Sequence, residues 1–395
     1  MQGAARIDEA LLFACERGDI PGAVAIAASA DTTLYEGAFG RRDLAKPQAM
    51  TTDSVFWIAS MTKAITAAAA MQLVEQGRLG LDEPVGGLVP ELSAPQVLEG
   101  FAADGAPLLR PARAPITLRH LLTHTAGFCY DMWNADLLRY RTQHDMPPTR
   151  SGKRASILTP IMADPGTRWE YGTSLDFAGL VVEAASGMRL DAYLREHIFA
   201  PLSMHDTAFR IGPAQRERLV SVHRREADGA LTPIAFEIEQ EPEFHAGGGG
   251  LYGSAPDYVK FMQMMLNQGR GNGAQVLQPV TVALMGQNHI GELHVTPMSS
   301  AIAFATNDVD LYPGMVKKWG LSFLINTEPT PEGRSAGSLA WAGLANTYYW
   351  IDLERAVCGV ILMQVLPFAD AKCLDAFTAF ERGVYACLGS GQKAA

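Results

Sequence analysis

The chain has 395 residues, of which 48% are hydrophobic and only 19% are charged. This composition supplies the apolar side chains of a large core and excludes intrinsic disorder over most of the length. Asp and Glu together number 42 against 32 Lys and Arg, which gives a formal net charge of −10. Without a basic surface to neutralise phosphates, we expect no nucleic-acid partner.

The cysteines and the apolar stretches indicate where the protein resides. Five cysteines are scattered without CxxC spacing, as is typical of reduced thiols in the cytosol. Arg6, Asp8 and Glu9 interrupt the start of the chain, so no secretory signal is recognisable there. The longest apolar stretches fall short of the roughly 18 residues that cross a bilayer. We therefore expect a cytoplasmic protein without a membrane-spanning segment.

The first predicted elements are a helix and a hairpin. Apolar residues at helical spacing predict a helix over residues 6–18, ended by Gly18. Two strand-like runs follow at 22–29 and 32–40, joined by a polar turn. A helix followed by a hairpin is typical of a sheet that is covered by helices.

The rest of the chain divides into a helical part and a second strand-rich part. From Ser60 to about residue 240 the sequence indicates helix and loop, interrupted by Pro and Gly. After this part come, in order, a helix at 257–267, strands at 318–326, 338–342, 346–352 and 357–364, and a helix at 369–388. Short turns between successive strands favour antiparallel pairing.

These elements predict an α+β fold. An antiparallel sheet flanked by terminal helices is expected to form from residues 1–62 and 240–395, so that both ends of the chain contribute to one domain. Residues 63–239 are expected to form a large inserted, mainly helical domain.

One lysine stands out by its isolation. Lys63 is the only charged residue between Asp53 and Glu75. Burial disfavours the charged form of an amine and lowers its pKa, so such a lysine can act as a base near neutral pH. Ser60, at the predicted helix start, lies three residues earlier on the same helix face. Its hydroxyl can therefore meet the amine and attack a carbonyl, while its own N–H at the helix N-terminus stabilises the oxyanion.

The sequence also allows other interpretations of its serines. Ser60 can be a simple N-cap whose lysine extends to solvent, and the Ser-x-x-Lys spacing occurs again by chance at 390–393. A rival nucleophile is Ser335 in GRSAG, which satisfies the G-x-S-x-G motif of α/β-hydrolases. That motif needs a helix after it and a later histidine, whereas all nine histidines lie at or before His294. We therefore expect Ser335 to lie in a surface loop.

Two histidines and a glycine run have both structural and functional readings. His120 and His124 are four residues apart on a predicted helix, which is a spacing that metal ligands can have. No HExxH signature or third ligand accompanies them, so we expect structural histidines and no metal. The glycines at 247–250 can be a hinge or can let the backbone approach a pocket, and their position at the return to the sheet favours the pocket.

Five motifs follow one another along the chain: Ser60-Met-Thr-Lys63, HLLTHTAGF, PGTRWEYGTS, GGGGLYGS and WAGLANT. In their order and spacing they resemble the serine β-lactamase/penicillin-binding-protein superfamily, and most of all its family VIII carboxylesterases. The resemblance extends from about residue 6 to residue 388. It implies a domain with an antiparallel sheet and an inserted helical domain, in agreement with the pattern above.

The resemblance also implies a role for each matching residue. Ser60 matches the nucleophile, Lys63 the lysine of the first motif and Tyr171 the tyrosine of the second motif. The backbone N–H groups of Ser60 and Leu344 match the oxyanion hole. The matches expected to bind substrate are Tyr130, Trp341 and Gly343.

Two departures from β-lactamases concern the substrate. The second motif has Thr173 in place of Asn, and the third begins with Trp341 in place of Lys. An indole offers one N–H and no charge, so a substrate carboxylate would lose its anchor. Neutral esters do not need that anchor.

Together these features predict a serine carboxylesterase that hydrolyses short-chain neutral esters through an acyl-Ser60 intermediate, without a cofactor. Its partner would be a small-molecule ester, and either Lys63 or Tyr171 can be the base. On the same fold the alternatives are an acyltransferase, a weak β-lactamase or a D-amino-acid peptidase. A ligand-binding relative without catalysis is the alternative from another class, and the intact Ser, Lys and Tyr set disfavours it.

Overall fold

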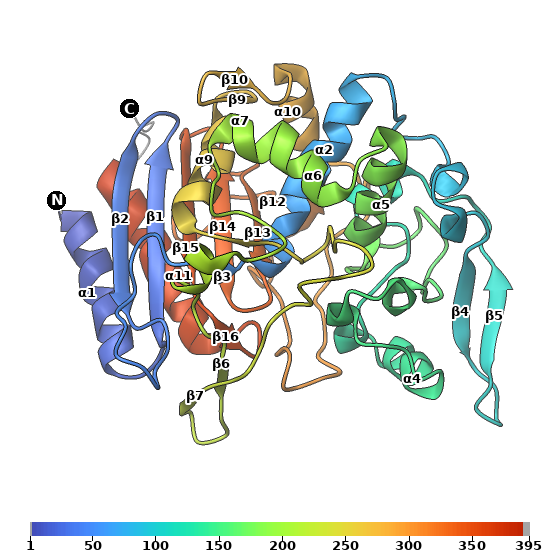
Figure 1. Ribbon diagram of the computed structural model, residues 1–395, viewed down its shortest axis with the longest axis horizontal. Coiled ribbons are helices and arrows are strands. Elements are labelled where there is room, and N and C mark those ends of the chain that lie inside the picture. Colours follow the sequence, from blue (N-terminus) through green and yellow to red (C-terminus); the bar gives the residue numbers. More distant parts are fainter. Residues whose placement is uncertain (1, 390–395) are drawn as a thin grey trace.

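The computed structural model of the protein describes residues 2–389. Its main sheet is formed by β1 Gly22–Ser29, β2 Thr33–Gly40, β11 Lys317–Trp319, β12 Leu324–Asn326, β13 Leu339–Gly343, β14 Thr347–Asp352 and β15 Val357–Leu362. The strand order is β11-β12-β13-β14-β15-β1-β2, and every neighbouring pair is antiparallel. The N-terminal hairpin thus joins the later strands through β1 and β15 (Figure 1).

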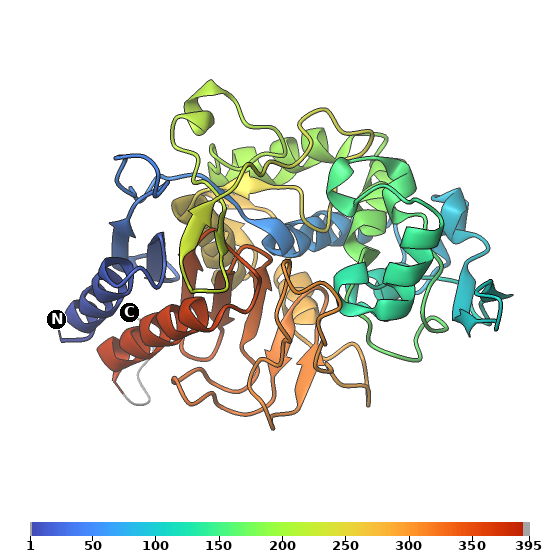
Figure 2. The same cartoon turned by 90° about the horizontal axis from the view of Figure 1, so that it is seen from below.

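Helices cover both faces of this sheet. α1 (Gln2–Glu16) and α11 (Ala371–Leu388) lie side by side on one face (Figure 2), and α9 (Ala255–Leu266) packs on β1 and β15 from the other. Because both faces are covered, all residues of β1 are buried, which explains its unbroken apolar sequence. The antiparallel sheet flanked by terminal helices is confirmed.

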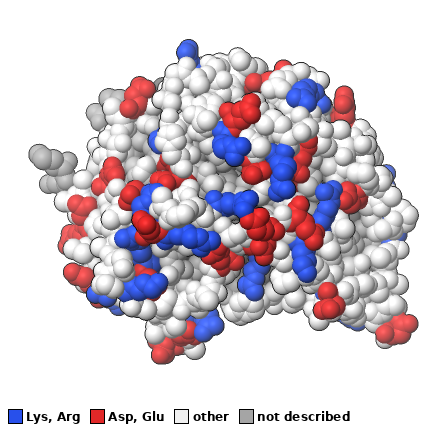
Figure 3. Space-filling model, viewed as in Figure 1, with Lys and Arg blue, Asp and Glu red and all other residues white. Residues whose placement is uncertain are grey.

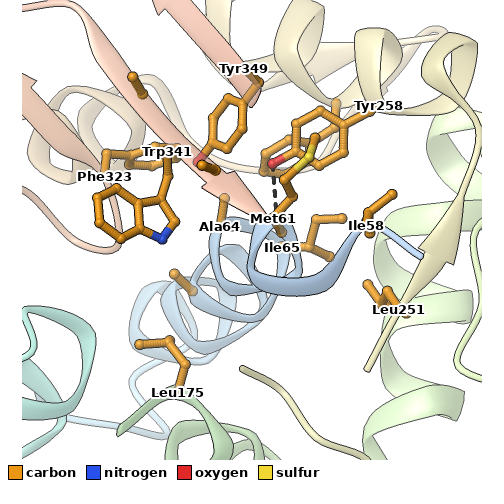
Figure 4. Packing of buried hydrophobic residues seen from close by; sticks show 14 of the residues in the cluster. Ile58, Met61, Ala64, Ile65, Leu175, Leu251, Tyr258, Phe323, Trp341 and Tyr349 are labelled. Atoms are coloured by element: carbon orange, nitrogen blue, oxygen red, sulfur yellow. Dashed lines mark hydrogen bonds between the residues drawn. The ribbon is translucent and has the colours of Figure 1, made fainter. Parts of the chain in front are cut away.

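α2 (Thr62–Glu75) lies between the sheet and the helical part of the molecule. Every residue from Thr62 to Leu73 is buried, which accounts for its nearly uncharged sequence. α5 (Ser174–Ser186) packs along α2. Figure 4 shows the apolar side chains that α2 meets, among them Trp341 and Tyr349 from the sheet and Leu175 from α5.

The inserted part contains short helices, turns and more strands than expected. Between β2 and α9, besides α2 and α5, the elements are β3 Phe56–Trp57, η1 Ala59–Met61, η2 Val85–Gly87, η3 Pro90–Leu92, β4 Gln96–Phe101, β5 Pro107–Pro111, α3 Leu118–Leu122, η4 Asp131–Trp133, α4 Ala135–Gln143, η5 Thr149–Ser151, η6 Arg154–Ile157, α6 Leu190–Leu194, η7 Arg195–Phe199, α7 Ala200–Leu202, α8 Pro213–Arg216, β6 His223–Arg225, β7 Leu231–Pro233 and β8 Tyr252–Gly253. The remaining elements are β9 Arg270–Gly271, β10 Ala274–Gln275, α10 Pro279–Met285 and β16 Val365–Leu366.

Two sequence predictions need correction. The β4–β5 hairpin was not expected, because its strands are short and half-exposed and β5 begins and ends with proline, which weakens the strand pattern. The single strand expected at 318–326 is two strands, β11 and β12. The chain reverses between them because Ser322 adopts a left-handed backbone, with φ +77°, and the Gly320 N–H bonds to the Phe323 carbonyl. The boundaries of the two expected domains stay a prediction.

Opposite charges are intermixed on the surface. On the face shown in Figure 3, Lys and Arg lie among Asp and Glu rather than in separate patches. Ion pairs such as Arg216–Glu237 also neutralise charge locally. In residues 2–389 no helix is long and apolar enough to cross a membrane. The second Ser-x-x-Lys match, at 390–393, lies outside the described residues.

Candidate active site

A cavity of about 130 Å³ lies between the turn η1 before α2, Leu344 directly after β13, and the segment 238–250. Ser60 and Leu344 both contribute to its wall. Most of the other wall residues are apolar or aromatic, including Trp57, Tyr130, Met132, Trp133, Phe209, Ile238 and Phe244. The structure therefore brings the predicted nucleophile to an apolar cavity.

Ser60 lies in the 3₁₀ turn Ala59–Met61, and α2 begins two residues later, at Thr62, rather than at Ser60. The Thr62 hydroxyl donates to the Ala59 carbonyl at 2.6 Å and closes the turn. Ala59 has φ +45°, a left-handed conformation that costs a non-glycine residue on the order of 1–3 kcal/mol. Surrounding packing thus holds the turn that carries Ser60 in a strained shape.

Lys63 meets Ser60 as the i,i+3 spacing predicts. Its Nζ donates to the Ser60 Oγ at 3.0 Å, to the Gly248 carbonyl at 2.5 Å and to the Tyr130 hydroxyl at 3.2 Å. The side chain is fully buried, as its isolation in the sequence predicts. Burial lowers the pKa of Lys63 to about 7, against an opposing effect of the Asp176 charge.

Tyr171 lies beside Lys63 and just behind the cavity wall. Its hydroxyl accepts a hydrogen bond of 2.8 Å from the Trp341 indole N–H, and the Lys63 Nζ is 4.8 Å from its ring centroid. Burial raises the pKa of Tyr171 above its ordinary value, and hydrogen bonds with Ser60 and Trp341 offset part of that rise. The phenol therefore keeps its proton at neutral pH.

Tyr130 is a second phenol at the site. It lines the cavity, as expected, and it also accepts a hydrogen bond from Lys63, which sequence reasoning missed. The two tyrosines lie together because Gly172 packs directly on the backbone of Cys129, where a side chain would not fit, and the Tyr130 N–H donates to the Tyr171 carbonyl at 3.2 Å. Burial raises the pKa of Tyr130 well above 10.

The third motif lies partly on the cavity wall and partly behind it. Leu344 lines the cavity, whereas Trp341 is buried, is not one of the wall residues, and donates its indole N–H to the Tyr171 hydroxyl. The contact of the indole with substrate stays a prediction. Gly343 is not a wall residue either. A Cβ at this position would lie 2.5 Å from the Ile58 carbonyl, so glycine here lets the end of β13 approach the Ser60 turn.

The glycine run forms part of the cavity wall, in agreement with the reading favoured above. Successive carbonyls of the run accept side-chain hydrogen bonds: Gly247 from Thr66 at 2.8 Å, Gly248 from Lys63 at 2.5 Å and Gly249 from Trp57 at 2.8 Å. A run fixed at three successive residues is a rigid wall rather than a hinge.

Asp176 is a site residue that sequence reasoning missed. It lies in the first turn of α5, is 2% exposed, lines the cavity and accepts a hydrogen bond of 2.9 Å from the Gly248 N–H. The signal that singled out Lys63 was also present here, because Asp176 is the only charge in the otherwise apolar stretch SLDFAGLVV.

The two histidines have structural positions. The His120 Nδ1 accepts a hydrogen bond from the Thr117 N–H, and the His124 Nδ1 accepts one of 3.4 Å from the Gly172 N–H. The prediction that His124 lies on a helix is wrong, because α3 ends at Leu122 and His124 has φ +56°. In the described part of the chain, no group of three or more His, Cys, Asp or Glu side chains is placed to hold a metal ion.

Ser335 lies in a loop, as expected. The chain leads from it into β13 rather than into a helix, and its backbone N–H donates to Asp352. It is not a wall residue of the cavity that Ser60 lines. The geometry of a nucleophile elbow is therefore not present around Ser335.

Comparisons with known proteins cover nearly the whole chain. Residues 8–382 match the Beta-lactamase family model. The chain is 33% identical to the monacolin J acid methylbutanoyltransferase of Aspergillus terreus, over 96% of this chain and 95% of that protein. It is 32% identical to the lovastatin esterase of Penicillium rubens, over 96% and 98%.

Solved structures show the same fold. Unliganded simvastatin synthase from Aspergillus terreus, in its selenomethionyl form, has a TM-score of 0.85 and 31% identity, covering 99% of this chain and 100% of that one. EstCE1, described as a hydrolase with promiscuous acyltransferase activity, has a TM-score of 0.75 at 24% identity, covering 96% and 99%. At that identity EstCE1 supports the fold alone.

Proposed function

Because the chain belongs to the Beta-lactamase family, we propose that it is an acyl-transferring serine enzyme that takes short acyl groups from neutral esters onto Ser60. One observation carries the proposal: the Ser60 Oγ, on the wall of an apolar cavity, lies 3.0 Å from the amine of a buried lysine. A hydroxyl becomes a nucleophile when a base lies within hydrogen-bond reach.

The protonation states support Lys63 as the base. With a pKa of about 7, Lys63 is partly unprotonated at neutral pH, whereas burial keeps Tyr171 protonated. Lys63 takes the Ser60 proton as the Oγ bonds to the ester carbonyl carbon, and the backbone N–H groups of Ser60 and Leu344 stabilise the oxyanion. When the C–O bond breaks, the proton passes to the leaving alcohol with Tyr171 as the relay. Water or a second alcohol then attacks the acyl-enzyme by the reverse sequence.

The size of the cavity supports a short acyl group. Its volume of about 130 Å³ is close to that of an engineered apolar cavity of about 150 Å³ that holds one benzene molecule. An acyl group of about four to six non-hydrogen atoms fits such a space. The apolar lining favours hydrocarbon over charged groups.

Transfer to an alcohol is the second candidate outcome. Acyl transfer to an alcohol is favoured by the relative named as a methylbutanoyltransferase. The alignment with this relative covers nearly all of this chain and nearly all of that protein. The lovastatin esterase relative, at nearly the same identity, supports hydrolysis. Both outcomes use the same acyl-Ser60 intermediate and differ only in the molecule that attacks it.

The test of the proposal is a rapid-mixing assay with p-nitrophenyl butyrate. We expect a burst of p-nitrophenol equal to the enzyme concentration, and an added mass of one butyryl group on the peptide that contains Ser60. Ser60→Ala should abolish both, whereas Ser335→Ala should retain activity within a few fold. A folded Ser335→Ala protein without activity would favour the elbow motif and overturn the proposal.

Two additions to the assay separate the alternatives. A series of alcohols shows whether the acyl group goes mainly to water, which indicates an esterase, or to alcohol at low concentration, which indicates an acyltransferase. A chromogenic cephalosporin tests for a β-lactamase, and we expect a much lower kcat/KM for it because Trp341 supplies no charge for its carboxylate. A cephalosporin kcat/KM equal to that for p-nitrophenyl butyrate would contradict the choice of neutral esters.

A further inference from the structure

Asp176 and Lys63 both form hydrogen bonds with the backbone of Gly248. The Gly248 N–H donates to the Asp176 Oδ1 at 2.9 Å, and the Gly248 carbonyl accepts from the Lys63 Nζ at 2.5 Å. A Cβ at position 248 would lie 2.8 Å from the Asp176 Oδ2. The carboxylate can therefore approach the backbone this closely because residue 248 is glycine.

The groups around the Lys63 amine differ in whether they can carry a charge. The groups that face its amine from the surrounding elements are Ser60, Tyr130, Tyr171, His124 and Asp176. The hydroxyl and the two phenols are neutral. Burial and the nearby Lys63 lower the pKa of His124 well below its usual value, so that His124 is neutral as well. Of these groups, Asp176 is the one that can carry a negative charge near neutral pH.

From this arrangement we propose that Asp176 is a positioning residue for Lys63: it anchors Gly248 against the amine and supplies the buried negative charge that balances the ammonium. The inference rests on the proposed acyl-enzyme function and deepens it, because it assigns to Asp176 the control of the pH range in which Ser60 is activated. In this role Asp176 acts through the Gly248 backbone and through the charge that it presents to Lys63.

The electrostatics agree with this role. An opposite charge nearby favours the ammonium form, so Asp176 keeps the pKa of Lys63 higher than burial alone would leave it. Burial raises the pKa of Asp176 to about 6, and the Lys63 charge opposes that rise. Each group thus stabilises the charged form of the other, although both are buried.

The first test is Asp176→Asn, compared with Glu183→Gln. The amide can still accept the Gly248 hydrogen bond but carries no charge. Loss of that charge destabilises the ammonium, so the limb of the kcat/KM profile that reports Lys63 should move to lower pH by about one unit or more. Glu183 lies on the same helix and also accepts a backbone hydrogen bond, from Leu190, so Glu183→Gln should leave the limb in place. An unmoved limb in folded Asp176→Asn protein would overturn the inference.

A second pair of variants disturbs the same contact from the glycine side. Gly248→Ala places a methyl group against the Asp176 carboxylate, and we expect it to move the Lys63 limb. Gly87→Ala is its control, because a Cβ there has nothing within 4 Å and Gly87 does not line the cavity. A limb that moves equally in both variants would contradict the role of Asp176.

A measurement without substrate separates this inference from the proposed function. The titration of Lys63 can be followed by NMR in protein with ¹³C-labelled lysine, with the Lys63 signal assigned by its loss in Lys63→Met. We expect its midpoint to fall in Asp176→Asn and to stay unchanged in Glu183→Gln. This result would support the role of Asp176 even if no acyl-enzyme formed in the burst assay. An unchanged midpoint alongside a normal burst would overturn the role of Asp176 and leave the proposed function intact.

Discussion

The indole N–H of Trp341 donates a hydrogen bond of 2.8 Å to the hydroxyl of Tyr171. Trp341 begins the motif in which β-lactamases carry a lysine for the substrate carboxylate. Here the side chain at that position is buried and contacts a proposed catalytic group instead of the cavity. In the proposed mechanism, the third motif would therefore influence proton transfer through the Tyr171 phenol more directly than it influences substrate recognition.

Replacing the indole should lower the rate more than the affinity. Trp341→Phe keeps a ring but removes the donor to Tyr171. We expect kcat to fall about 10- to 100-fold, since a hydrogen bond to a group that gains charge contributes about 1.5–3 kcal/mol, and KM to change little. The matched control is Trp319→Phe, which loses an N–H bond of 3.3 Å to the Leu122 carbonyl. Equal losses of kcat in both variants would show that the hydrogen bond to Tyr171 has no special role.

The buried Lys63 should make stability depend on pH. Its pKa is about 7 in the folded protein and 10.5 as its ordinary value, so the unfolded chain binds more protons between these values. The free energy of unfolding should therefore rise with pH through this window, and Lys63→Met should remove that contribution. Urea unfolding at several pH values measures both slopes. Parallel curves for the two proteins would mean that the pKa of Lys63 is not lowered.

The pH profile of activity should follow the same group. If unprotonated Lys63 is the base, kcat/KM rises as pH increases through about 7 and then levels off. Steady-state assays with p-nitrophenyl butyrate across this range give the profile. A fall in kcat/KM through the same range would instead mean that the ammonium is the active form.

Gly343 should be sensitive to the smallest side chain. In Gly343→Ala the new Cβ would meet the Ile58 carbonyl and push the end of β13, with Leu344, away from the Ser60 turn. Loss of one oxyanion donor costs about 10²- to 10³-fold in kcat, so we expect a fall of this size with a smaller change in KM. Gly87→Ala is the control, because a Cβ there has nothing within 4 Å. A Gly343→Ala enzyme with normal kcat would remove the Leu344 N–H from the proposed mechanism.

Phe244 should limit the length of the acyl group. It is buried and lines the cavity, so Phe244→Ala should enlarge the cavity and raise kcat/KM for p-nitrophenyl octanoate relative to the butyrate. Phe199→Ala makes the same deletion at a buried residue that does not line this cavity, and should leave the ratio unchanged. The same ratio in wild type and Phe244→Ala would place the acyl group elsewhere.

Local patterns predicted much of the sheet and one pair of site residues. The run that became β1 is continuous and apolar because the strand is covered on both faces, and such a run can be recognised without knowing its partners. Ser60 and Lys63 are three residues apart, so the geometry of a single helical turn brings them together. The β4–β5 hairpin was not predicted, because the apolar and polar residues of its short, half-exposed strands show little periodicity.

The amino-acid sequence by itself determined which groups are isolated in apolar segments and which fall on one helical turn, since both depend on near neighbours alone. Only the tertiary structure decided that Trp341 faces Tyr171, that Tyr130 reaches Lys63 and that Asp176 holds Gly248. These partners lie 170, 67 and 72 residues apart. Their contacts depend on how the sheet, α2 and α5 pack together, and no local spacing encodes that packing.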